Sequence, residues 1–392
     1  EDADLFKELC KGLWIESIFF LFIFIYIIIL KKMKVAFFLT IKGWWYDEIK
    51  LNKTMRETIY SHVKGIHKKT KLRIDYAVGY YLQHMYRNTN DVVIDLIKPE
   101  DIIKKKTFNI NKYDLVITQW LSPLAVFQTY KDVAGKAYSN MLARHHTKVY
   151  PPPKYTNFVE DKCAYSALLR NKNIPSPMDF CVSKTMYDKS KNKDAFVHGI
   201  VKKIQSKQIN NNNKVFVKPI LGTGSWGTKV LNPSKRSSWK KYLESTFEKK
   251  KYPKVLVQNF YPNFGTTHME IRYVFIGEKL SHTAANNSSG KWFRPTQEGG
   301  KLKLPEYNKL KKYAETILKT ILKPMFFGKL PMLETRIDFG CCLNGQKGKY
   351  WVNEIEYAGG VLSFMDKNTQ FDLHTKFTEQ LVKLIEHKRK KH

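Results

Sequence analysis

The 392-residue sequence is poor in cysteine, and the five it has form no C-x-x-C pair and no zinc-ligand spacing. This excludes the disulfide-scaffold and zinc-finger classes, and we expect reduced thiols in a cytoplasmic protein. Hydrophobic residues make up 43% of the chain and aromatic residues 14%, so it can bury a core and is not disordered throughout. The cysteines are Cys10, Cys163, Cys181, Cys341 and Cys342.

Acidic residues are also scarce, because 35 Asp and Glu stand against 68 Lys and Arg, for a net charge of +33. Only 10 of the basic residues are arginine. Lysine is encoded by A/T-rich codons, so a biased genome is one sufficient cause and favours a solvated lysine-rich surface. The alternative is a field that attracts anions. No motif for DNA or RNA binding occurs, and we expect no nucleic-acid partner.

Long apolar runs are absent except at residues 18–30, IFFLFIFIYIIIL, which precede Lys31 and Lys32. A helix of this length covers about 20 Å, less than the ~30 Å hydrocarbon core of a bilayer. We therefore expect residues 1–32 to be an apolar N-terminal segment that is either a membrane anchor or the product of a mis-called start ahead of Met33. A buried helix is a third option. A membrane partner is expected only if residues 18–30 are a real anchor.

The rest of the chain predicts an α/β (α+β) fold in two domains. Residues 33–150 alternate short apolar strands with helical stretches and predict an N-terminal α/β domain, bounded by the three prolines at 151–153. Residues 151–387 predict a second, β-rich domain, and 388–392 form a basic tail. The expected strands are 35–39, 92–97, 115–119, 215–220, 228–231, 255–260, 271–276 and the hairpin 334–343/349–357; the expected helices include 161–172, 307–323 and 371–387.

Glycine is clustered at residues 222–227, which spell G-x-G-x-x-G. A dinucleotide-binding fold is excluded because a short strand, not a helix, is expected after the loop. A Walker loop is excluded because Thr228 precedes Lys229. The D-F-G at 338–340 has no H-R-D before it, which excludes a protein kinase. There remains Lys218, on the strand that leads into the loop, where it would bind phosphate together with backbone N–H groups. A surface hairpin tip is the alternative.

Carboxylates gather on the last predicted hairpin. Asp338 lies on one strand, and Glu354 and Glu356 lie two apart, hence on one face, of the other. The Asn-Gly turn at 344–345 brings these strands together. Converging carboxylates repel one another unless a cation lies among them, and Mg²⁺ is the natural one. Arg336, on the same face as Asp338, would also balance charge. A solvated polar face is the alternative.

These parts, in this order, resemble the ATP-grasp superfamily, especially bacterial-type glutathione synthetases, D-alanine–D-alanine ligases and ribosomal-protein glutamate ligases. The resemblance covers residues 161–366 well, with 33–149 as a plausible preceding domain. Its motifs are D-K at 161–162 with I-P-S-P at 174–177, V-K-P at 217–219 before the glycine loop, V-Q-N-F at 257–260, E-I-R-Y-V-F-I-G at 270–277, K-W-F-R at 291–294, R-I-D-F at 336–339 and N-E-I-E at 353–356.

The resemblance implies ATP and Mg²⁺ as cofactors and assigns roles to individual residues. Phosphate binding would fall to Lys162 and Lys218, under a loop that includes Gly222, Gly224, Ser225 and Gly227. Adenine and ribose binding would fall to Gln258, Asn259, Phe260 and Glu270. The metal ligands would be Asp338, Glu354 and Glu356, with Glu356 standing where these families usually have Asn. Arg272, Arg294 and Arg336 would bind phosphate or stabilise the transferring group.

The implied activity is that of a Mg-ATP-dependent ligase that joins a small-molecule or peptide carboxylate to an amine through an acyl phosphate. The reaction would form a C–N bond and release ADP. One alternative is an ATP-grasp-type kinase of a polyanionic alcohol such as an inositol phosphate. Another is a nucleotide-binding protein without turnover. The sequence indicates neither the two substrates nor the oligomeric state.

Overall fold

The computed structural model describes residues 32–41, 48–89, 91–105, 107–209, 213–221, 227–261, 268–286, 292–293, 304–342, 350–357 and 369–391. The expectation for the apolar segment therefore falls almost entirely outside the described residues. Within them, no helix combines the length and the apolar character needed to cross a membrane.

The N-terminal domain is built on a parallel sheet with the strand order β4-β1-β5-β6. Almost every residue of β1 is buried, because helices cover both faces of the sheet, and this explains its nearly continuous apolar sequence. The strands are β1 (Met33–Phe38), β4 (Val92–Ile97), β5 (Leu115–Ile117) and β6 (Val149–Tyr150). The hairpin β2 (Glu48–Lys50)/β3 (Lys71–Arg73) and helices α2 (Lys53–Glu57), α3 (Ile74–Tyr86), α4 (Pro99–Ile103) and α5 (Pro123–Arg144) complete it.

A second, antiparallel sheet, here called the small sheet, has the order β7-β10-β8-β9. Val215, Val217, Val255 and Val257 pack under helices on one face, and the alternate positions turn to the other face. Its strands are β7 (Asp179–Ser183), β8 (Val215–Pro219), β9 (Lys229–Leu231) and β10 (Lys254–Asn259). Its helices are α8 (Lys184–Lys189), α9 (Lys193–Ser206), α10 (Arg236–Leu243) and the π-helix η3 (Glu244–Lys249).

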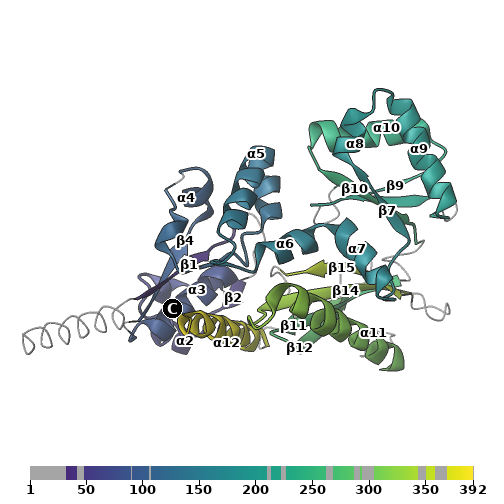
Figure 1. The fold of residues 1–392 in the computed structure, drawn as a ribbon. Coiled ribbons are helices and arrows are strands. Elements are labelled where there is room, and N and C mark those ends of the chain that lie inside the picture. Colours follow the sequence, from purple (N-terminus) through teal and green to yellow (C-terminus); the bar gives the residue numbers. More distant parts are fainter. Residues whose placement is uncertain are drawn as a thin grey trace, which may run out of the picture.

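A third sheet, here called the large sheet, is antiparallel with the order β13-β12-β11-β14-β15. Its apolar face, which includes Ile271, Tyr273, Ile337 and Phe339, belongs to the largest buried cluster. The strands are β11 (His268–Ile276), β12 (Lys279–Asn286), β13 (Trp292–Phe293), β14 (Glu334–Cys342) and β15 (Tyr350–Glu356). Helix α11 (Leu304–Thr316) and the π-helix η4 (Ile317–Phe327) lie along this sheet (Figure 1).

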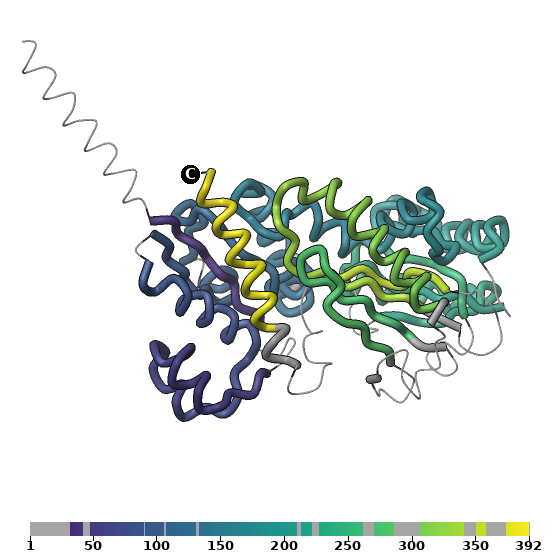
Figure 2. The backbone as a smooth tube through the Cα atoms, turned by 90° about the horizontal axis from the view of Figure 1, so that it is seen from below, coloured from purple at the N-terminus to yellow at the C-terminus, as the bar shows by residue number. Residues whose placement is uncertain are grey.

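Two connecting helices and the last helix join these units. Helices α6 (Pro153–Glu160) and α7 (Lys162–Asn171) lie between the small and large sheets (Figure 1). Helix α12 (Thr369–Arg389) returns to the N-terminal domain and lies beside it in the view of Figure 2. There Phe377 packs against Trp120, with ring centroids 4.9 Å apart.

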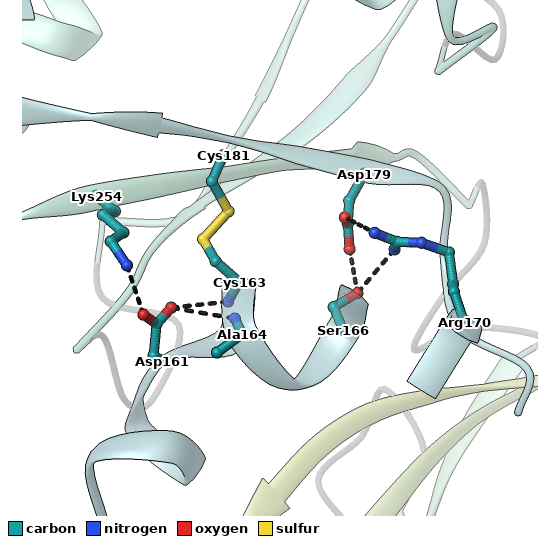
Figure 3. Close-up of a disulfide and its surroundings, with 8 residues drawn as sticks. All are labelled: Asp161, Cys163, Ala164, Ser166, Arg170, Asp179, Cys181 and Lys254. Atoms are coloured by element: carbon teal, nitrogen blue, oxygen red, sulfur yellow. Dashed lines mark hydrogen bonds and ion pairs between the residues drawn. A yellow bond between two sulfur atoms is a disulfide. The ribbon is translucent and has the colours of Figure 1, made fainter. Parts of the chain in front are cut away.

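The expectation that the cysteines are reduced thiols is wrong for one pair. A disulfide joins Cys163 at the start of α7 to Cys181 in β7, with Cα atoms 6.1 Å apart (Figure 3). The same two elements are also held together by Asp179, which accepts from Ser166 and pairs with Arg170 at 2.7 Å. The pairing could not be read from cysteine spacing because it arises from the packing of α7 on β7.

Candidate functional site

A cavity of about 240 Å³, here called the cleft cavity, lies between the two antiparallel sheets. The expected adenine-binding residues Gln258, Asn259 and Phe260 all line it. Its other lining residues are Phe216, Val230, Tyr261, Trp351 and Asn353. It is therefore a small space whose lining combines aromatic and aliphatic side chains with amide groups, a lining suited to a flat heteroaromatic ring.

Aromatic packing shapes one wall of the cleft cavity. The rings of Tyr261 and Trp351 are stacked, with centroids 3.9 Å apart and an interplanar angle of 13°. Trp351 lies against Gly340 on the neighbouring strand, where an added Cβ would come within 2.3 Å of the indole ring. Glycine at position 340 therefore gives the indole its place beside the cavity.

Lys218 brings a buried ammonium group to the cleft from β8. Its side chain is 5% exposed, and its Nζ lies 3.5 Å from Oδ1 of Asn353 on β15. Burial lowers the pKa of Lys218 to about 8, although Glu354 favours the charged form. Lys218 thus has little compensation inside the protein, and an anion in the cleft would be stabilised by it.

Lys162 reaches the same region from the start of α7. Asp161 caps this helix by accepting from the backbone N–H groups of Cys163 and Ala164 (Figure 3). The Nζ of Lys162 lies 2.9 Å from Oε1 of Glu354. Burial opposes both charges, but the pair raises the pKa of Lys162 and lowers that of Glu354. The cap on α7 therefore positions a lysine directly against the acidic hairpin.

The hairpin expectation is confirmed by the strand register, which pairs Asp338 with Glu354 and Arg336 with Glu356. Arg336 donates to both carboxylate oxygens of Asp338, with Nε 2.8 Å from Oδ1 and Nη2 2.8 Å from Oδ2. The same Nη2 lies 2.8 Å from Glu356. The predicted balancing role of Arg336 is therefore observed.

The next strand extends this charged face. Arg272 lies opposite Asp338 on β11, and its Nη2 is 2.7 Å from Oε1 of Glu270. Asn353 donates to the other oxygen of Glu270 at 3.0 Å. Acids and arginines thus alternate across the face of the large sheet that turns toward the cleft.

The fit of this face to Mg²⁺ depends on its carboxylates. Within the described residues, no three His, Cys, Asp or Glu side chains stand in an arrangement that would hold a metal ion. Asp338 is fully buried, which raises its pKa to about 7 against the pull of Arg336. Glu354 and Glu356 are 23% and 24% exposed, and each has one oxygen on a cation. Carboxylate oxygens are the donors that Mg²⁺ prefers, so the donor type of this set fits the ion, although the three carboxylates do not converge on one point as they stand.

Part of the expected phosphate site lies outside the described residues, namely Gly222, Gly224, Ser225 and Arg294. Gly227 is described and has φ +77°, and an added Cβ would come within 2.8 Å of Pro219. Glycine is therefore required where the loop returns to β9.

Polar groups that the sequence did not single out lie at the carboxyl end of β5. Gln119 donates to the backbone carbonyl of Tyr357, which directly follows β15. Among the described residues, Oε1 of Gln119 and Nε1 of Trp120 are buried without a hydrogen-bond partner. Ligands of parallel α/β sheets bind beyond the carboxyl ends of the strands. The predicted end of this strand at Gln119 was the signal that could have found them.

No model of a protein family matches the sequence. No curated protein matches it either. Solved structures do match in fold. D-Cycloserine synthetase is 13% identical with a TM-score of 0.56, covering 89% of this chain and 99% of that one. D-Alanyl-alanine synthetase A from Vibrio cholerae O1 is 14% identical with a TM-score of 0.52, covering 92% and 100%. The chain has the ATP-grasp fold.

A further solved ATP-grasp structure, the D-alanine–D-alanine ligase from Bacillus anthracis complexed with ATP, is 13% identical. Its TM-score is 0.50, and the match covers 92% of this chain and 99% of that one. The expected fold class, an ATP-grasp fold preceded by an N-terminal α/β domain, agrees with matches of this coverage. At such low identity the likeness extends to the fold alone.

Proposed function

We propose that this ATP-grasp protein is a Mg-ATP-dependent carboxylate–amine ligase that works through an acyl phosphate. The observation that carries the proposal is the meeting of Lys218 and Lys162 with Glu354 beside a ring-sized cavity. The ligases and the synthetase that share the fold, one of them complexed with ATP, support the same class of reaction.

Under this proposal the cleft cavity holds adenine between Phe216, Tyr261 and Trp351. Gln258 and Asn259 supply hydrogen-bonding groups at the ring edge, and Glu270 binds the ribose. Lys218 and Lys162 bind phosphate oxygens, the second by exchanging Glu354 for phosphate. The described glycine, Gly227, lies against Pro219, the residue that follows Lys218.

Glu354 and Glu356 would hold Mg²⁺, with Asp338 as the third ligand. Bound there, the ion would supply charge neutralisation of the triphosphate. Arg336 already holds Asp338 and Glu356 in place, and Arg272 holds Glu270. Arg294 would contact the transferring group. These positively charged groups lower the cost of moving negative charge from ATP to a carboxylate.

We assign the carboxylate and amine substrates to the space beyond β5 and β15. There Gln119 and Trp120 offer a buried acceptor and a buried donor without partners among the described residues. Tyr357 connects the end of β15 to this region through Gln119. We propose small-molecule or peptide acids and amines as the substrates, with polar groups that these two atoms could bind.

The test incubates the full chain with Mg-ATP and pools of amino acids, peptides and inositol phosphates. A ligase releases ADP and free phosphate only when a carboxylate and an amine are both present. Transfer of labelled phosphate to an alcohol, without free phosphate, would instead establish the kinase. Binding of ATP without turnover in every pool would leave a nucleotide-binding protein.

A single charge change provides the matched control. Glu354→Gln removes the negative charge that holds Lys162 and would hold Mg²⁺, so turnover should fall by at least about a hundredfold. Glu244→Gln changes an exposed carboxylate in η3 and should leave turnover unchanged. Full activity in Glu354→Gln would refute the assignment of the metal site.

A further inference from the structure

A second and larger cavity, of about 550 Å³, lies where the N-terminal domain meets the loop end of the small sheet. We call it the α5 cavity because α5 forms one side. Helix α6, the start of α8 and the segments at 220–221 and 251–254 form the others. The two cavities share none of their described lining residues. Its volume falls in the range of small-molecule sites.

The α5 cavity combines apolar and basic surfaces. Its apolar lining consists of Pro123, Phe127, Ile220, Leu221 and Pro253. Its basic lining consists of Lys136, Lys184, Lys251 and Lys254. An organic molecule with both an apolar body and a negative group would match the two surfaces.

The charges of the cavity do not cancel. Lys254 pairs with Asp161 at 2.5 Å, and Lys184 pairs with Asp188. Lys251 has no ion pair among the described residues, and it is an exposed residue that lines the cavity. The remaining acid, Glu160, is 8% exposed and accepts hydrogen bonds from Tyr357 and the backbone of Leu124. The lining thus carries four lysines against three acids, so an anion entering the cavity meets a net positive charge.

The cavity also touches the elements that lead to the proposed phosphate site. Leu221 directly precedes the glycine loop, and its carbonyl accepts from Gln128 of α5 at 2.8 Å. Asp161 directly precedes Lys162 and caps α7. A molecule against Leu221 and Asp161 would thus bias the position of both phosphate-binding elements.

We infer that the α5 cavity binds a small organic anion with an apolar body, and that this anion changes the affinity of the cleft for nucleotide. The inference that the cavity binds an anion depends on the cavity alone. The inference that this anion changes nucleotide affinity rests on the proposed function. The cavity shares no described lining residue with the cleft cavity, and Gln119 and Trp120, where we assign the substrates, do not line it. We therefore assign the anion the role of an effector and not of a substrate.

The probe for anion binding is 8-anilinonaphthalene-1-sulfonate, whose rings and single sulfonate have the required character. It is titrated by fluorescence against the folded full chain without nucleotide. We expect one saturable site, and binding at least about tenfold weaker in Lys251→Glu because the charge is reversed at the cavity. Lys250→Glu, one residue away but not lining the cavity, should bind the probe like the unaltered chain.

A second variant tests the space, not the charge. Ser139→Trp fills the cavity from α5 and should abolish probe binding, with circular dichroism confirming that the variant is folded. The neutral N-phenyl-1-naphthylamine should bind at least about tenfold more weakly than the sulfonate. Unchanged probe affinity in both Lys251→Glu and Ser139→Trp, or equal affinity for the neutral probe, overturns the inference.

The coupling is tested by repeating the titration with saturating Mg-AMP-PNP, a non-hydrolysable ATP analogue. The probe affinity should change by at least about threefold, and the nucleotide affinity by the same factor, since linkage is reciprocal. Nucleotide binding with no change in probe affinity refutes the coupling. No nucleotide binding at all refutes the proposed function, while the first titration still decides the site.

Discussion

The two antiparallel sheets differ in whether their buried cations are paired with acids. The large sheet pairs its cations within the sheet, because Arg336 contacts Asp338 and Glu356, and Arg272 contacts Glu270. The small sheet contributes Lys218, which is buried and has only a neutral amide within hydrogen-bonding reach among the described residues. The ion pairs of the large sheet therefore stabilise the fold, whereas the charge of Lys218 in the small sheet does not.

This difference separates the groups that maintain the structure from those available to a ligand. A buried charge that loses its partner is strongly destabilising, whereas replacing a poorly compensated buried charge by an apolar group is neutral or stabilising. Removing a cation from each sheet should thus affect stability in opposite directions.

The largest effect is expected for Arg336→Met on the large sheet. It removes the cation of Glu356 and the nearer of the two cations of the fully buried Asp338, which keeps only Arg272 at 3.6 Å, so the free energy of unfolding should fall by about 3–5 kcal/mol. Urea unfolding measures the change. Arg336→Lys keeps the charge but loses the bidentate contact with Asp338. Its free energy of unfolding should lie between those of the unaltered chain and Arg336→Met. A loss below about 1 kcal/mol in Arg336→Met would show that the network is not stabilising.

The disulfide gives the next effect, on the side of the small sheet. Cys163 and Cys181 are 18 residues apart, and closing a loop of this size stabilises a fold by about 3 kcal/mol. Reductant should therefore lower the unfolding midpoint of the chain. A Cys163→Ser/Cys181→Ser variant should match the reduced chain and no longer respond to reductant. An equal midpoint with and without reductant in the unaltered chain would contradict the pairing.

The sequence predicted those parts of this comparison that depend on local pattern. The strands expected at 215–220, 255–260 and 334–343 are β8, β10 and β14 within one or two residues, because their apolar residues alternate or run together. The meeting of Asp338 with Glu354 followed from the hairpin. Strand β7 (Asp179–Ser183) was missed because it is short and begins and ends with polar residues.

What could not be predicted depends on how elements far apart in the chain pack. The Lys162–Glu354 pair requires α7 to lie on β15, and the disulfide requires α7 to lie on β7. The sharing of Arg336 between two acids and the lowered pKa of Lys218 depend on burial that no local pattern gives.

A smaller effect is expected at the wall of the cleft cavity. Gly340→Ala would bring a methyl group within 2.3 Å of Trp351, so the indole must shift, at a cost of about 1–3 kcal/mol. Gly199→Ala is the control, since nothing lies within 4 Å of an added Cβ in this exposed part of α9. It should stabilise by up to about 1 kcal/mol. Equal unfolding midpoints for the two variants would remove the role assigned to Gly340.

The smallest loss of stability, or even a gain, is expected for Lys218→Met. Burial lowers the pKa of Lys218 to about 8, so between pH 8 and 10.5 the unfolded chain binds more protons at this residue than the folded one. Lys218 is therefore unfavourable to folding below pH 8, and this effect fades as the pH rises. The variant should be as stable as the unaltered chain or more so at pH 7, with the difference shrinking above pH 8.

The same residue should control nucleotide affinity. Lys218 is charged below pH 8, so the affinity of the unaltered chain for Mg-ATP should be constant there and fall as the pH rises above 8. Lys218→Met should bind at least about tenfold more weakly at pH 7 and lose this pH dependence. Calorimetric titration at pH 7 and pH 9 measures the affinity for Mg-ATP and its pH dependence. Unaltered affinity in Lys218→Met would contradict the proposal that Lys218 of the small sheet binds phosphate.

The central claim, an acyl phosphate formed in this cleft, is tested most directly by oxygen-isotope transfer. Carboxylate substrates labelled with ¹⁸O are incubated with the full chain, Mg-ATP and amines, and the released phosphate is analysed by mass spectrometry. If ATP phosphorylates the carboxylate before the amine attacks, each amide formed leaves one ¹⁸O atom in the phosphate. Amide formation with unlabelled phosphate would contradict the mechanism.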